Sequence, residues 1–145
     1  KVFFIDLDLI IKNSVYGKKI LDNINKINDE NISQLKKKEN ELRSIEEEIK
    51  KKQNILSQDE LSKEVNTLKN KVNIFNSDKD KMVNELKKTR QDSINNFFEK
   101  VSPIIQSYME ENSISILLDR KNVFIGRVNS DITKEIIERI NNQLK

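Results

Sequence analysis

The chain has 145 residues, of which 35% are charged and only 35% hydrophobic, and its formal net charge is +3. So polar a chain with only two glycines and one proline favours long helices in a coiled coil or an oligomer over a compact globular monomer. Because it contains no cysteine and no histidine, disulfides, thiol nucleophiles, thiolate metal sites and imidazole acid–base chemistry are excluded.

The first predicted element lies in the apolar segment 2–11, which is rich in residues that favour β-strands. Alternate residues of this segment share one apolar face, and they are Phe3, Ile5, Leu7 and Leu9. This alternation predicts a half-buried strand over residues 2–7. Asp6 and Asp8 share the opposite face, and we interpret them as surface carboxylates because no other reactive residue converges on them. Ser14 is predicted to cap the helix that follows.

Residues 18–112 show helical periodicity almost throughout. Narrow apolar stripes of the coiled-coil kind occur on both sides of Ser57 and Glu60, which have the spacing of a capping box and therefore mark the start of a new helix. The stripes consist of Leu35, Leu42, Ile49 and Leu56 before the box, and of Leu61, Val65, Leu68, Val72, Phe75, Met82 and Leu86 after it. We therefore predict an antiparallel helical hairpin over residues 14–100 with its tip near 55–59. A single continuous helix in a fibrous coiled coil is the alternative.

We predict that residues 1–13 and 101–145 together form a small body that contains β-strands. Two β-rich runs separated by a short polar turn predict a β-hairpin over residues 114–127. Asp131 is predicted to cap a short final helix with an apolar face. The predicted fold class is α+β, with strands 2–7, 114–119 and 123–127 in one sheet. Three strands make a weak isolated sheet, so we expect the body to assemble into a homotrimer.

The residues expected in the core of the body and trimer are Phe3, Ile5, Leu7, Ile116, Leu118 and Phe124. Basic residues on the hairpin are candidates for contacts with anionic lipid or with a bound polypeptide, and they are Lys50, Lys51, Lys52, Lys79, Lys81, Lys87, Lys88 and Arg90. Solvated coiled-coil surfaces carry similar runs, and no aromatic residues interleave with these, which argues against nucleic acid as a partner. The pair Lys18-Lys19 after Gly17 lacks the upstream glycine of a phosphate loop. No nucleophile–base group is present, so we expect neither an enzyme nor a cofactor.

The two ends of the chain together resemble the Skp/OmpH family of periplasmic chaperones. KVFFIDLDLIIKNSVYGKK resembles the opening of the family, and NSISILLDRKNVFIGRVNSDITKEIIERI resembles its closing segment with the Asp-Ile-Thr signature. The resemblance implies a trimeric barrel with three helical hairpins, which hold unfolded outer-membrane proteins without ATP. It also implies a periplasmic location, with a signal peptide removed before Lys1, and lipopolysaccharide or an anionic membrane surface as a further partner. Met82 stands where the family's basic cluster would place another cation.

Two other protein classes fit parts of the same pattern. A coiled-coil scaffold or spacer would share the long apolar stripes, and a prefoldin-like cytosolic chaperone would also present helical hairpins from a β-body. The N-terminal strand and the Asp-Ile-Thr segment at 131–133 favour the periplasmic family over both.

Overall fold

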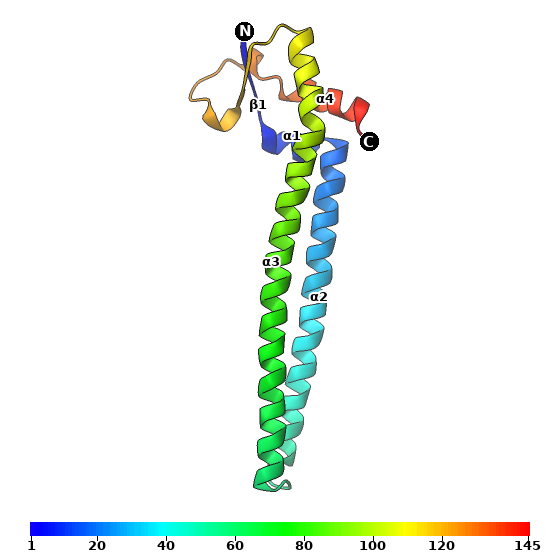
Figure 1. The fold of residues 1–145 in the computed structure, drawn as a ribbon, viewed down its shortest axis with the longest axis vertical. Coiled ribbons are helices and arrows are strands. Elements are labelled where there is room, and N and C mark those ends of the chain that lie inside the picture. The colour runs from blue at the N-terminus through cyan, green and yellow to red at the C-terminus, as the bar shows by residue number, and fades with distance from the viewer. The chain divides into compact units, whose positions relative to one another are not determined.

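The computed structural model describes all residues 1–145. Two long helices account for most of the chain, and the strands are short (Figure 1). In chain order the elements are β1 (Val2–Ile5), α1 (Leu7–Asn13), α2 (Val15–Lys52), α3 (Gln58–Glu111), β2 (Ile116–Asp119), the 3-10 turns η1 (Arg120–Asn122) and η2 (Val128–Ser130), and α4 (Thr133–Gln143). The elements form two compact units: residues 1–25 with 89–145, called the body, and residues 26–88, called the hairpin.

The body is built around a single apolar core. Phe97 and Val101 of α3 are completely buried together with Ile10 of α1 and with Ile136 and Ile140 of α4. Their spacing of four residues within α3 and within α4 places each pair on one helix face, which is the face turned to the core. The core therefore draws on both ends of the chain, and α2 contributes the ring of Tyr16, which stacks on Phe97 at 5.8 Å between centroids.

The N-terminal strand is shorter than predicted, and the prediction of a strand over residues 2–7 is wrong beyond Ile5. Asp6 caps the helix α1 instead, because its Oδ1 accepts a hydrogen bond of 3.0 Å from the backbone N–H of Leu9. Leu7, Ile10 and Ile11 then follow the spacing of a helical face. The apolar segment 2–11 thus forms a strand and a helix. Asp6, which was predicted to lie on a face of the strand, is the residue between them.

The predicted three-stranded sheet is also wrong, because the sheet has two strands. β1 and β2 pair in parallel, with Val2 opposite Ile116 and Ile5 opposite Asp119. Residues 123–127 form no strand, so the predicted hairpin over 114–127 is absent. Its turn is replaced by η1, where the side chain of Asp119 accepts a hydrogen bond from the N–H of Lys121. The bridge from Phe4 to Asp131 occupies the other edge of β1.

The hairpin consists of parts of α2 and α3, and the capping box predicted from Ser57 and Glu60 is confirmed. Glu60 N–H donates to Ser57 Oγ at 3.2 Å, and Ser57 N–H donates to Glu60 Oε2 at 3.1 Å. The turn occupies residues 53–57, so α3 begins at Gln58. Between Lys26 and Lys88 no residue is fully buried. The two helices therefore meet along a thin seam whose side chains all keep contact with solvent.

Candidate interaction surfaces

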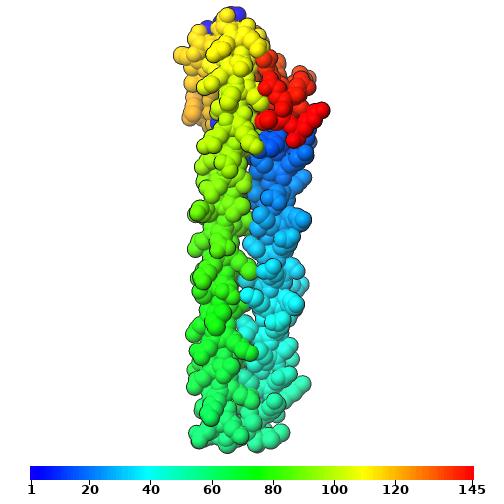
Figure 2. Space-filling view, turned by 45° about the vertical axis from the view of Figure 1, so that its right-hand side comes forward, coloured from blue at the N-terminus to red at the C-terminus, as the bar shows by residue number.

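The body exposes a segment of apolar side chains that is unusual for a solvated loop. Phe124 is 98% exposed, Val128 90% and Ile125 83%. They belong to the stretch between β2 and α4, which lies at the surface of the body (orange in Figure 2). Exposed apolar groups gathered on one segment mark sites of association more often than single exposed residues do.

The six residues predicted for the core of the body divide into two groups. Ile5 is buried, and Phe3 and Leu7 are partly buried against the core. Ile116 and Leu118 of β2 and Phe124 are instead exposed in the chain. The second group lies on β2 and just beyond it, and the polar residues 119–122 separate its two parts in the chain.

Ion pairs fix the beginning of this segment, and close packing fixes its middle. Lys121 Nζ lies 2.9 Å from Asp8 Oδ2, and Arg120 Nη1 lies 3.7 Å from Asp131 Oδ2. The hydrogen bond and the positive charge of Lys121 lower the pKa of Asp8, and Asp8 in turn raises the pKa of Lys121. Gly126 lies so close to the ring of Phe4 that a Cβ there would be 2.5 Å from it. The segment is thus held to β1 and α1 while its apolar side chains point to solvent.

The closing Asp-Ile-Thr segment connects β1 to α4 through hydrogen bonds. Asp6 N–H donates to Thr133 Oγ1 at 2.9 Å, and Ile132 N–H donates to the carbonyl oxygen of Phe4 at 3.1 Å. The prediction that Asp131 caps the last helix is wrong, because the N-cap of α4 is Ile132, which makes no side-chain capping bond. Asp131 lies one residue earlier, and its Oδ1 accepts from the backbone N–H of Thr133 at 3.0 Å. These bonds join the N-terminal strand to the last helix, which is a structural role for residues that the sequence singled out as a signature.

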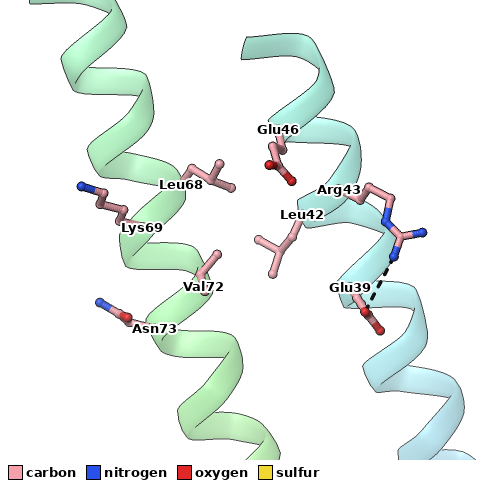
Figure 3. Close-up of a pocket in the computed structure, with 8 residues that line it drawn as sticks. All are labelled: Glu39, Leu42, Arg43, Glu46, Leu68, Lys69, Val72 and Asn73. Carbon is pink, nitrogen blue, oxygen red and sulfur yellow. Dashed lines mark ion pairs between the residues drawn. The ribbon is translucent and has the colours of Figure 1, made fainter. Parts of the chain in front are cut away.

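The hairpin carries a groove between α2 and α3 with a volume of about 510 Å³. Leu42 of α2 faces Leu68 and Val72 of α3 across it (Figure 3). Its polar rim consists of Glu39, Arg43, Glu46, Lys69 and Asn73. Three of its eight lining residues are therefore apolar, and five are polar or charged.

The sequence belongs to a known family along almost its whole length. The model of the family described as outer membrane protein (OmpH-like) matches residues 1–140. The chain belongs to the OmpH-like family. No curated protein matches it significantly. A crystal structure of an OmpH-like protein from Caulobacter crescentus CB15, proposed to be an outer membrane chaperone, has the same fold: the TM-score is 0.92 at 21% identity, over 99% of this chain and 85% of the other.

The basic residues that the sequence picked out do not form one site in this OmpH-like chain. Lys50, Lys51 and Lys52 occupy the last turn of α2, and Lys50 pairs with Glu46 at 3.6 Å. The remaining five, Lys79, Lys81, Lys87, Lys88 and Arg90, lie on α3. The ion pair between Lys38 and Asp78 shows which residues of the two helices lie opposite each other. Counted from this pair, the nearest ends of the two clusters are roughly 20 Å apart along the helix axis.

Some residues that shape the OmpH-like fold escaped the sequence argument. Gly17 is one, because a Cβ there would lie 2.0 Å from the carbonyl oxygen of Ile11. Buried Ser14 accepts the Gly17 N–H at 3.1 Å and, as predicted, caps α2. The proximity of Ser14 and Gly17 in sequence was the available signal. The structure holds no cluster of acidic side chains suited to a metal ion, and none of its helices combines the length and apolarity needed to cross a membrane.

Proposed function

We propose that this chain is a periplasmic holdase chaperone that keeps unfolded outer-membrane proteins from aggregating, without nucleotide. The observation that carries the proposal is the pairing of a well-packed body with a hairpin in which no residue is fully buried. Such a hairpin exposes seam side chains that can exchange contacts with a polypeptide. Membership of the OmpH-like family and the fold shared with a proposed outer membrane chaperone support the same function.

The body assembles the protein into a homotrimer in this proposal. β2 has a free edge, and three apolar side chains on it or just after it remain exposed within the chain: Ile116, Leu118 and Phe124. An open strand edge invites pairing with another chain. Three copies would cover these groups and complete a barrel, which is how Phe124 would join a core.

In this proposal the hairpins hold the client, which is the unfolded outer-membrane protein, while the body holds the trimer together. An unfolded barrel strand alternates apolar and polar side chains. Half-exposed seam residues such as Leu42 and Leu68 offer weak apolar contacts, while the charged residues around them keep the complex soluble. Weak contacts from three hairpins around one client would add up through multivalency. Release would follow from handover or folding, since the proposed mechanism uses binding alone and no chemical step.

The two basic clusters, at Lys50–Lys52 and at 79–90, are proposed as contacts for anionic surfaces such as lipopolysaccharide. Charge that is exposed to water is screened by salt, so this contact would weaken at high ionic strength. Neither cluster has interleaved aromatic residues that would stack on bases, and nucleic acid is therefore not proposed as a partner.

The proposal is tested by diluting an urea-unfolded outer-membrane barrel protein into buffer and following its light scattering. We expect the chain to suppress scattering equally with apyrase, with ATP or with neither. A matched control is a designed two-helix coiled coil of similar length and charge, which should not protect. Protection that required ATP would overturn the nucleotide-independent mechanism, and protection by the coiled-coil control would show that a mere spacer suffices.

A further inference from the structure

Two grooves run along opposite faces of the hairpin, and an ion pair between the helices crosses only one of them. The groove of Figure 3 lies over Leu42, Leu68 and Val72 and has a volume of about 510 Å³. The opposite groove, which includes Ile74 in its lining, has about 260 Å³. Lys38 of α2 and Asp78 of α3, both in its lining, pair across it at 3.1 Å. An occupant of the smaller groove would have to displace this ion pair.

The ion pairs of the larger groove leave it open. Arg43 pairs with Glu39 at 3.8 Å, and Glu46 pairs with Lys50 at 3.6 Å, so both pairs run along α2 and neither crosses to α3. Lys69, on the α3 wall, forms no ion pair. Three of the four charged residues of the rim are therefore already neutralised, and the remaining one is a cation beside the apolar floor.

We infer that this groove is the client subsite of the hairpin and that it selects extended segments in which an acidic residue stands two positions from an apolar one. The apolar side chain would lie over Leu42, Leu68 and Val72, and the carboxylate would meet Lys69. In an extended chain, side chains two residues apart point to the same side about 7 Å apart, and adjacent ones point to opposite sides. An apolar residue can therefore enter the groove while an acidic residue two positions away, on the same side of the chain, reaches the rim. This inference rests on the proposed holdase function and adds a sequence preference to it.

Matched substitutions on α3 separate this groove from the opposite one. Lys69→Glu changes a rim charge of the larger groove, and Lys71→Glu makes the same change in net charge beside the smaller one. Val72→Phe fills the larger groove, and Ile74→Phe adds a ring on the opposite face. All four positions are exposed in the chain, so each variant should keep the helical circular dichroism and melting temperature of the parent.

The probes are two short fluorescein-labelled peptides, one repeating valine-serine-aspartate-serine and the other repeating valine-serine-lysine-serine, so that valine and the charged residue share one side of the extended chain. Fluorescence anisotropy should show tighter binding of the acidic peptide by the parent protein. We expect Lys69→Glu to weaken that binding about threefold, as for an exposed ion pair. Val72→Phe should weaken the binding of both peptides about fivefold, because its ring would occupy the space in which the apolar side chain of the peptide is buried. Lys71→Glu and Ile74→Phe should leave both affinities unchanged.

Three results would overturn the inference: no binding of either peptide by the parent, equal affinity for the two peptides, or equal loss in the variants of both faces. The proposed function is judged separately, by suppression of aggregation of the full client. The parent protein could protect the client while its Lys69 and Lys71 variants bind the acidic peptide with equal affinity. That result would support the holdase function and contradict the role of the groove as the client subsite.

Discussion

Phe124 offers the sharpest test of how the chain assembles. Its side chain is 98% exposed within one chain, so Phe124→Ala should cost the isolated chain little stability. If the trimer buries it, the substitution removes about 2 kcal/mol of apolar burial in each subunit. Summed over three subunits, the loss is about 6 kcal/mol per trimer, or about four powers of ten in the constant for dissociation into three chains.

The constant for dissociation into three chains has units of concentration squared. The protein concentration at which half of the trimer has dissociated should therefore rise about a hundredfold. Sedimentation velocity over a dilution series measures the midpoint directly. The control is Ile74→Ala, which removes a comparably apolar side chain that is 60% exposed on the hairpin. This variant should have the same dissociation midpoint as the parent. The reasoning is refuted if Phe124→Ala dissociates at the parental concentration, or if it lowers the melting temperature of the dissociated chain.

Two further predictions concern the body itself. Phe97→Ala should lower the free energy of unfolding by about 3–5 kcal/mol, because it empties a completely buried site against Tyr16; urea denaturation followed by circular dichroism measures this, and a loss below about 1 kcal/mol would mean that Phe97 does not anchor the core. Gly17→Ala should destabilise by about 1–3 kcal/mol, although alanine favours helices, because its Cβ would meet the Ile11 carbonyl at 2.0 Å; a higher melting temperature in the same denaturation series would contradict the close approach of α1 and α2.

The helical part of the fold was readable from the sequence because its signals are local. The capping box at Ser57 and Glu60 fixed the start of the second helix, and the spacing of the apolar stripes fixed its seam. Phe97 and Val101 are four residues apart, which places both on the face of α3 that lies in the core. Helix periodicity and capping depend on residues three and four apart, so one sequence suffices to detect them.

The strands were harder to predict, because a short apolar run in the sequence does not identify the strand with which it pairs. Residues 2–11 satisfied a strand pattern as far as Leu9, yet Asp6 began a helix there. The run at 123–125 was apolar enough for a strand, but within one chain Phe124 and Ile125 face solvent. Pairing partners lie far away in sequence or in another copy, and alternation alone does not identify them. For the same reason the groove over Leu42, Leu68 and Val72 could be seen only once the register of α2 and α3 was known.

The central claim is that the hairpin holds the client and the body holds the assembly together. Deleting residues 38–78 and joining the ends with a short turn removes the groove and most of the seam, while every residue of the body core remains. On one sample of this variant, sedimentation should still report a trimer, and the light-scattering assay should report that protection of an unfolded outer-membrane protein is largely lost. A truncated trimer that protects its client at full strength would place client binding in the body and contradict the account.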